Sequence, residues 1–361
     1  MPTPHLFVDI SSHGFGHLAQ VAPILNELAR QRPDLRLSVR SGLSPEKLRA
    51  RVQCSFTHIP GRSDFGYVML DAVRIDHAAS ATAYRDQHRN WQQRVAAEAS
   101  LLRHVKPDLL LSDVAYLPLA GAAQAGIPSL AMCSLNWADL FAHFYGNQPW
   151  APAIHHEMLA AYGAAECFLR LTPAMPMADF PRTRAIAPVA ASACDRRAEL
   201  LAQLPCAPDS RLVLVAFGGF SKDLAAARWP YAKGVHYLVP QSWSPARDDM
   251  SASEPLGLPF NELLGSVDAV LTKPGYGSFT EAACSGTAVV YLRRDDWPEQ
   301  DCLIDWLQLN ARCLEISEAD LLRSDWPARL DGLWQQASPA RPRPDGVGEV
   351  ASLLAERLSH A

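Results

Sequence analysis

The first forty residues alternate between short apolar runs and one amphipathic stretch, and this alternation constrains the fold more than any other feature. Residues 6–10 form a mainly apolar run, and a glycine-rich turn covers residues 11–17. Apolar residues then recur at helical spacing over residues 18–28, and a second apolar run follows at residues 35–39. This strand, loop, helix and strand order predicts the beginning of a doubly wound parallel sheet.

The same alternation returns in two later parts of the chain. Helices are predicted at 96–105, 117–125, 279–285 and 347–358, and strands at 109–112, 129–133, 212–217, 235–239, 268–271 and 288–292. Residues 63–89 are polar and irregular, so we predict no regular structure there. We regard them as an insertion that faces an acceptor substrate. Residues 171–191 contain four prolines, which is typical of a connector between domains.

A chain of 361 residues is too long for one ordinary core. We therefore expect an α/β protein with two doubly wound, Rossmann-like parallel-sheet domains that face each other across a cleft. The expected parts are residues 1–180, residues 181–345 and a final helix within residues 346–361 that packs back on the first domain. Ligands of such sheets bind at the carboxyl ends of the strands, so the informative residues should follow the strands.

Composition excludes several functions. The net charge of −5 argues against a nucleic-acid-binding protein, which needs a basic face. The eight cysteines include no C-x-x-C pair and are expected to be reduced core residues rather than disulfides or zinc ligands. No uninterrupted apolar run reaches 18 residues, so no integral membrane segment is expected. The first residues lack a secretory leader pattern, and we expect a cytoplasmic protein.

A phosphate site is predicted after the strand that ends at Thr272. Gly275 and Gly277 allow the backbone to approach a ligand closely, and Ser278 can cap the helix that follows. The free amides and the dipole of a helix N-terminus favour a phosphate. Lys273 can neutralise phosphate charge, although a solvated lysine is an equally good interpretation.

Acidic and amide side chains near this loop indicate a sugar ligand. Glu281 is placed within reach of ribose hydroxyls, and Glu299 and Gln300 follow the next strand, where a carboxylate and an amide suit vicinal hydroxyls. The competing interpretation makes the glycines simple turn residues and Glu281 a solvated helix residue. The order of strand, glycines, acid, strand and Glu-Gln favours the ligand-binding interpretation.

A proton acceptor is predicted in the first domain. His17 begins the first helix, and a neutral imidazole can take a proton from a hydroxyl near pH 7. Asp113 ends a strand of the same domain and could fix the tautomer of that imidazole. His13 competes with His17 for this role, and either histidine could instead only position a ligand. No third residue accompanies the two histidines at a metal-ligand spacing, so we expect no metal site.

These segments resemble the GT-B glycosyltransferases. Thr-Lys-Pro-Gly-Tyr-Gly from Thr272 and His-Gly-Phe-Gly-His from His13 resemble the sugar-transferase-like module of plant L-arabinokinase. Ser-Asp-Phe-Gly from Ser63 and Arg-Ile-Asp from Arg74 resemble the same module more weakly. The segment from Leu271 to Gln300 is also similar to the donor-binding segment of the UDP-glucosyltransferases and the peptidoglycan GlcNAc transferase. The kinase part of L-arabinokinase has no counterpart here, so no sugar-kinase activity is expected.

The resemblance implies a role for each matching position. It implies that Glu281 binds the ribose, that Glu299 and Gln300 hold the donor sugar, and that two loops bind the diphosphate. These loops are Gly275, Tyr276, Gly277 and Ser278, and, after the first strand of the second domain, Gly218 and Gly219.

We therefore predict a metal-independent, inverting glycosyltransferase of the hexosyltransferase type. Its co-substrate would be a nucleoside diphosphate sugar, most simply a UDP-sugar, with no other cofactor and an unidentified acceptor. Two alternatives belong to other classes. One is a nucleotide-sugar hydrolase or epimerase, and the other is a non-catalytic protein that binds nucleotide sugars. Consumption of the donor without an acceptor, or binding without turnover, would separate them.

Overall fold

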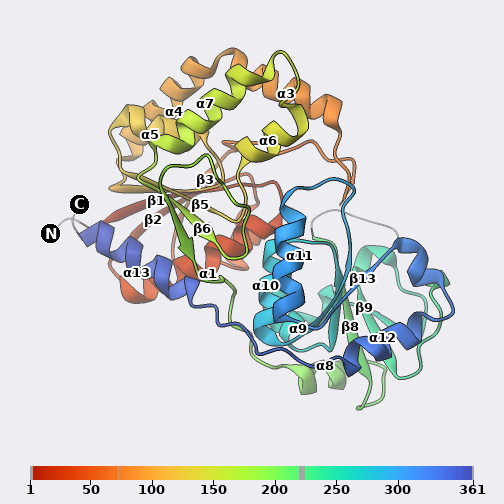
Figure 1. Cartoon of the computed structure of the whole chain (residues 1–361). Helices are drawn as coiled ribbons and strands as arrows, with labels where there is room; N and C mark the ends of the chain where they lie inside the picture. The colour runs from red at the N-terminus through yellow and green to blue at the C-terminus, as the bar shows by residue number, and fades with distance from the viewer. Residues whose placement is uncertain (1–2, 72, 219–223, 360–361) are drawn as a thin grey trace.

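Two parallel β-sheets, each covered by helices, make up the computed structural model, which describes residues 3–71, 73–218 and 224–359 (Figure 1). The first sheet has seven strands in the order β3-β2-β1-β4-β5-β6-β7. The second has six in the order β10-β9-β8-β11-β12-β13. In both sheets the strand order reverses beside the first strand, β1 or β8, as in a doubly wound fold. The predicted fold class is confirmed.

The first domain begins with the predicted strand, helix and strand. Its strands are β1 (His5–Ile10), β2 (Arg36–Ser41), β3 (Thr57–Pro60), β4 (Leu109–Asp113), β5 (Ser129–Cys133), β6 (Cys167–Leu171) and β7 (Thr183–Ile186). Its helices are α1 (Phe15–Gln31), α2 (Pro45–Arg49), α3 (His77–Arg89), α4 (Trp91–Val105), α5 (Leu117–Ala125), α6 (Trp137–Tyr145) and α7 (Ala151–Ala164). The group from α3 to α7 lies on one face of the sheet, and α1 lies on the other (Figure 1).

The second domain repeats this plan. Its strands are β8 (Arg211–Ala216), β9 (Val235–Val239), β10 (Met250–Ala252), β11 (Ala269–Thr272), β12 (Ala288–Leu292) and β13 (Cys313–Ile316). The α-helices that follow β7 are α8 (Arg197–Gln203), α9 (Phe260–Gly265), α10 (Tyr276–Ser285), α11 (Glu299–Asn310), α12 (Trp326–Gln335) and α13 (Gly346–Ser359). Short 3₁₀ turns occupy Ala226–Arg228, Gln241–Trp243, Glu254–Leu256 and Glu318–Leu322.

The division of the chain differs slightly from the expected one. Strand β7 pairs with β6 in the first sheet, where Phe168 is the partner of Thr183. The first sheet therefore extends to Ile186, beyond the expected boundary at residue 180. Helix α13 returns to the first domain and packs against α1 (Figure 1).

The region 63–89 is more ordered than its sequence suggested. Residues 77–89 form α3, whose N-cap Asp76 accepts a hydrogen bond from the Ala79 amide at 2.9 Å. The preceding segment reaches the second domain, because the Val73 side chain is buried in the same apolar cluster as Leu292 and Ile316. The prediction of no regular structure is wrong for residues 77–89. The segment before them packs against the second domain through Val73.

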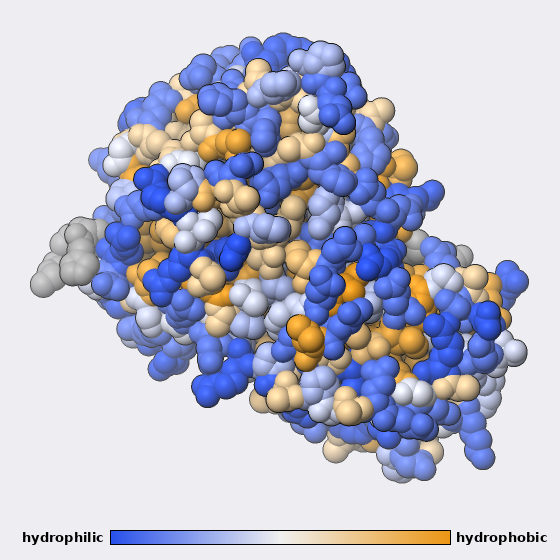
Figure 2. Space-filling model, viewed as in Figure 1, coloured by the Kyte–Doolittle hydropathy of each residue, from blue (hydrophilic) through white to orange (hydrophobic). Residues whose placement is uncertain are grey.

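The apolar content of the sequence goes chiefly into the cores on both sides of each sheet. On the face drawn in Figure 2, hydrophilic residues cover most of both domains, with apolar residues between them. Over the part of the chain that the structure describes, no helix has both the length and the apolar character needed to span a bilayer.

Candidate active site

A cavity of about 510 Å³ lies between the two domains and receives residues from both. The first domain contributes the beginning of α1 and the residues just after α2. The second domain contributes the residues that follow β8, β11 and β12, together with the first half of α10. The cavity therefore lies at the carboxyl ends of both central groups of strands, where a doubly wound sheet binds its ligands.

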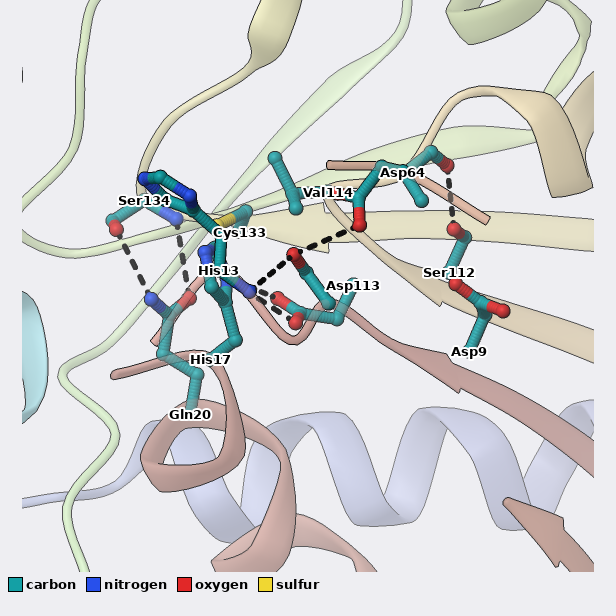
Figure 3. A network of polar contacts seen from close by, with 12 residues as sticks. Asp9, His13, His17, Gln20, Asp64, Ser112, Asp113, Val114, Cys133 and Ser134 are labelled. Carbon is teal, nitrogen blue, oxygen red and sulfur yellow. Dashed lines mark hydrogen bonds and ion pairs between the residues drawn. The ribbon is translucent and has the colours of Figure 1, made fainter. Parts of the chain in front are cut away.

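His17 and Asp113 meet on the first-domain side of this cavity. The Nδ1 atom of His17 is 3.2 Å from Oδ2 and 3.3 Å from Oδ1 of Asp113 (Figure 3). His17 is 7% exposed and lines the cavity, whereas Asp113 is fully buried. Burial lowers the pKa of an imidazole, but the Asp113 carboxylate outweighs this, and the pKa of His17 lies well above its ordinary value. In the neutral ring, Nδ1–H donates to Asp113, and Nε2 carries the lone pair.

His13 has a different environment and a different proton. Its Nδ1 accepts a hydrogen bond from the Tyr67 amide at 3.4 Å, so the neutral ring carries its proton on Nε2. Burial, followed by the charges of His17, Arg294 and Lys273, lowers the pKa of His13 to about 3. His13 also lies near parallel to the Trp297 ring, with centroids 6.0 Å apart. Geometry thus makes His13 a hydrogen-bond donor and leaves His17 as the basic histidine.

A third polar residue lies beside His17 and Asp113. The thiol of Cys133, at the end of β5, is 3.9 Å from Nδ1 of His17. His17, Asp113 and Cys133 place a nitrogen, an oxygen and a sulfur atom within 4.8 Å of one another, and no other described residue joins this group of metal-ligand types. Burial and the Asp113 charge raise the pKa of the Cys133 thiol, which keeps it protonated.

The turn after Asp113 has an unusual backbone. Val114 has φ 63°, a left-handed conformation that is costly for a β-branched residue. The Tyr162 hydroxyl donates to the Val114 carbonyl, and the Ser112 hydroxyl donates to the Ala115 carbonyl at 2.6 Å. These hydrogen bonds hold the turn and thereby fix the position from which Asp113 reaches His17.

On the opposite side of the cavity, helix α10 begins without a side-chain cap. Its N-cap residue is Gly275, and Ser278 is the third residue of the helix, so the prediction that Ser278 is the cap is wrong. Glu281 lies in the second turn of this helix. Because no side chain among the described residues satisfies the leading amides, the N-terminus of α10 remains available to an anion. Gly275 and Ser278 both line the cavity.

Tyr276 and Gly277 line the cavity but also join the domains. The Tyr276 hydroxyl donates to the Thr172 carbonyl at 3.0 Å and accepts from the Val189 amide at 3.0 Å, on either side of β7. A Cβ atom at Gly277 would lie 2.8 Å from Cβ of Ala19 in α1. The missing side chain at position 277 therefore permits close packing of α1 against α10.

Two cations reach the cavity without a carboxylate partner among the described residues. Lys273 follows β11, and burial, followed by the Arg294 charge, lowers its pKa to about 7. Arg294 follows β12, is 7% exposed and lies with its guanidinium carbon 3.8 Å from the Trp297 ring centroid. Its Nε atom is buried and has no hydrogen-bond partner, and burial lowers the pKa of Arg294 to about 10. A buried polar atom without a partner costs free energy, which an anionic ligand would recover.

Glu299 lines the cavity, whereas Gln300 does not. One carboxylate oxygen of Glu299 accepts from the Ser134 hydroxyl at 2.6 Å, and the other accepts from the Trp297 indole at 3.0 Å. Ser134 belongs to the first domain, where it also pairs with Gln20 of α1 (Figure 3). The Gln300 amide bonds the backbone of Arg294 at 2.9 and 3.2 Å. Gln300 therefore shapes the loop that carries Arg294, and its expected contact with a donor sugar does not fit this geometry.

Glu281 lines the cavity and is paired with a residue that sequence reasoning missed. Nη1 of Arg51, just after α2, lies 2.6 Å from Oε1 of Glu281.

Gly218, with φ 75°, lines the cavity after β8, and the predicted Gly219 lies outside the described residues. Arg294 was also missed, although its place after a strand and before Glu299 is a signal that could have identified it.

Comparisons with known proteins agree with this architecture. No protein-family model matches the chain. L-arabinokinase of Arabidopsis thaliana is 26% identical over 371 residues, which cover 97% of this chain and 34% of that protein. The chain thus spans about a third of the length of this curated relative.

Solved structures resemble the chain over almost its whole length. A calicheamicin glycosyltransferase has a TM-score of 0.66 at 18% identity, with 99% of each chain covered. A UDP-glucosyltransferase of Polygonum tinctorium has a TM-score of 0.62 at 14% identity, again with 99% of each chain covered. The glycosyltransferase VinC, solved with dTDP, has a TM-score of 0.60 at 15% identity, and the match covers 99% of this chain and all of the VinC chain. The fold of this chain is therefore the GT-B fold of these glycosyltransferases.

Proposed function

We propose that this chain transfers a glycosyl group, most simply a hexosyl group, from a nucleoside diphosphate sugar to an acceptor hydroxyl. The transfer would invert the anomeric carbon and use no metal ion. One observation carries this proposal. One cavity joins a basic histidine held by a buried carboxylate on one side to Lys273, Arg294 and the N-terminus of α10 on the other, and no described residue forms an ion pair with these two cations or caps this helix.

The second domain would bind the leaving nucleotide. Lys273, Arg294 and the leading amides of α10 supply the positive charge that a diphosphate needs as its bond to the sugar breaks. This is the charge that a divalent cation supplies in metal-dependent phosphate chemistry, which is why we propose transfer without one. Phe260 lines the adjoining part of the cavity, where we place the nucleobase.

The first domain would activate the acceptor. Nε2 of neutral His17 would accept the hydroxyl proton, and Asp113 would stabilise the imidazolium that forms. Nε2–H of His13 would donate a hydrogen bond to a ligand oxygen. Because the base and the diphosphate site lie on opposite walls, the acceptor would attack from the side opposite the leaving group, which inverts the anomeric centre.

The names of the similar structures support the donor class. A UDP-glucosyltransferase and a structure solved with dTDP are among them, so a nucleoside diphosphate is the ligand to test first. We favour a UDP-sugar.

A binding panel followed by turnover tests the proposal. UDP, dTDP, ADP, GDP and CDP are first compared by thermal shift, and one should raise the melting temperature in the absence of divalent cations. The matching nucleotide sugars are then incubated with hydroxyl acceptors and followed by NMR, which also reports the anomeric configuration of the product. His17→Ala should abolish turnover while the thermal shift survives. Donor cleavage at an equal rate without any acceptor would instead indicate a hydrolase, and no thermal shift with any nucleotide would refute the proposal.

A further inference from the structure

The carboxylate expected to bind the ribose is already in contact with the opposite domain. Nη1 of Arg51 donates to Oε1 of Glu281 at 2.6 Å, and Nη2 is 3.5 Å from Oε2. The two residues are 230 positions apart, Arg51 in the first domain and Glu281 on α10 in the second. The side chain of Glu281 is 2% exposed and that of Arg51 is 17% exposed, and both line the cavity.

We propose that Arg51 is a positioning residue of the nucleotide site. From the opposite domain it orients the Glu281 carboxylate and holds it in the charged form that receives the ribose hydroxyls. This inference rests on the proposed function, because it assumes a nucleoside diphosphate in the cavity. It adds a residue that no motif of the sequence identifies.

Arg51 is the one described cation positioned to compensate the Glu281 charge. The pKa of Glu281 lies above its ordinary value, because burial raises it by more than the Arg51 charge and hydrogen bond, with a hydrogen bond from the Ala191 backbone, lower it. A second titratable group on which the Glu281 charge acts is the Cys284 thiol, one turn further along α10, and burial followed by that charge raises its pKa to about 12. Phe260 and Leu263 of α9 add only apolar surface to this part of the cavity. Without Arg51, Glu281 would be a buried carboxylate with a strong tendency to protonate.

The contact leaves room for a ligand. A carboxylate has about four lone-pair directions, and the Arg51 contact uses the nearer oxygen strongly and the other weakly. The remaining directions can accept ribose hydroxyls in charge-assisted hydrogen bonds, which are about twice as strong as neutral ones. A protonated Glu281 would lose this advantage.

Arg51 is itself held in place from α1. The Asn26 side-chain amide donates to the Arg51 carbonyl at 2.9 Å, and its oxygen accepts from the Gln53 amide at 2.8 Å. The guanidinium carbon lies 5.5 Å from the centroid of the Phe260 ring. The Arg51 contact with the ribose carboxylate therefore forms only when the two domains are together, which links nucleotide binding to this arrangement of the domains.

The test compares nucleotide affinity across pH in the wild type, Arg51→Lys, Arg51→Gln and Arg51→Ala. The ligand is the nucleoside diphosphate that gives the largest thermal shift in the panel above, and affinity is measured by calorimetry between pH 6 and pH 8.5. Inorganic pyrophosphate is the matched control ligand, because it can occupy the diphosphate site but has no ribose. Comparing each variant with the wild type at the same pH cancels the ionisation of the phosphate groups.

Loss of the Arg51 charge should make nucleotide binding depend on pH. Removing the cation raises the pKa of Glu281, so the carboxylate protonates as the pH falls. Arg51→Gln and Arg51→Ala should bind within about threefold of the wild type at pH 8.5 and about tenfold more weakly at pH 6, since one linked proton changes affinity by up to tenfold per pH unit. Arg51→Lys should keep the wild-type pH dependence, and pyrophosphate affinity should not change in any variant.

Other outcomes separate this inference from the function on which it rests. An unchanged pH dependence in Arg51→Gln, or an equal loss of pyrophosphate and nucleotide affinity, would overturn the role of Arg51 and leave the transferase proposal standing. Absence of nucleotide binding by the wild type would overturn both. If Arg51→Ala does not fold, as circular dichroism would show, Arg51→Gln and Arg51→Lys still decide the question.

Discussion

Replacing Asp113 by asparagine removes the charge beside His17 and changes one atom of a fully buried side chain. Among the described residues, Asp113 is the carboxylate paired with His17, at 3.2 Å from Nδ1. The asparagine amide can donate to Nδ1 of His17, which places the imidazole proton on Nε2. In the proposed reaction Nε2 must be free of a proton, because it takes the proton of the acceptor hydroxyl. Turnover should then lose most of the general-base contribution, about 10²- to 10⁴-fold, which corresponds to about 3–5 kcal/mol of barrier.

The pH dependence gives this prediction a second readout. The pKa of His17 lies well above its ordinary value because Asp113 outweighs the effect of burial. His17 acts as a base only when unprotonated, so the wild-type kcat/KM should rise with pH through this elevated pKa. Without the carboxylate the lowering effect of burial is opposed only by the smaller raising effect of Cys133 among the causes that act on His17. The residual activity of Asp113→Asn should therefore reach its plateau at a lower pH than in the wild type.

Steady-state kinetics across pH, with nucleotide affinity from calorimetry, checks both effects. Nucleotide affinity should survive in Asp113→Asn, because the residues proposed to bind the diphosphate belong to the other domain. Asp139→Asn, an acid of α6 that does not line the cavity, is the matched control and should keep wild-type kinetics. The reasoning is refuted if Asp113→Asn retains more than a tenth of the wild-type kcat with the same pH midpoint.

Three further predictions concern the second domain. Lys273→Met should weaken pyrophosphate binding by about 10- to 100-fold, the equivalent of a charged hydrogen bond of about 1.5–3 kcal/mol. Because the folded pKa of Lys273 is lowered to about 7 from its ordinary value of 10.5, the unfolded chain binds more protons between these values. The free energy of unfolding of the wild type should therefore increase as the pH rises from about 7 towards 10.5. In thermal unfolding, Lys273→Met should lack this increase, whereas the control Lys233→Met, at an exposed lysine, should keep it. Gly277→Ala should lower stability by about 1–3 kcal/mol, because its Cβ would lie 2.8 Å from that of Ala19. Gly275→Ala, whose Cβ has only a carbonyl oxygen at 3.9 Å, should lose less, at most about 1 kcal/mol for an alanine at the N-cap, and equal melting of both variants would contradict the packing role of Gly277.

Local sequence patterns were sufficient where a physical requirement acts over a few residues. A buried parallel strand needs an apolar run, and the helix after it needs apolar residues at helical spacing, so β1, α1 and β2 could be predicted. Helix α3 was missed because it buries only a narrow stripe, Ser80, Tyr84 and His88. That spacing of four residues, with Asp76 before the helix, was the available signal.

The candidate site divides in the same way. The sequence placed His17, Asp113 and Glu281 after strands or near helix starts. The binding edge of a doubly wound sheet then accounts for the position of His17 and Glu281 at one cavity, with Asp113 buried behind His17. It did not determine which residue caps α10, since that depends on the backbone angles of Gly275 rather than on the hydroxyl of Ser278.

Only the tertiary structure decided how the two domains meet. The contacts of Arg51 with Glu281 and of Ser134 with Glu299 join residues 230 and 165 positions apart. No periodicity or spacing encodes such pairs, because they depend on the relative placement of two separately folded sheets. The sequence alone determined two doubly wound domains and the loops that carry polar groups. The packing of the two domains decided which of the described polar groups are paired across the cavity.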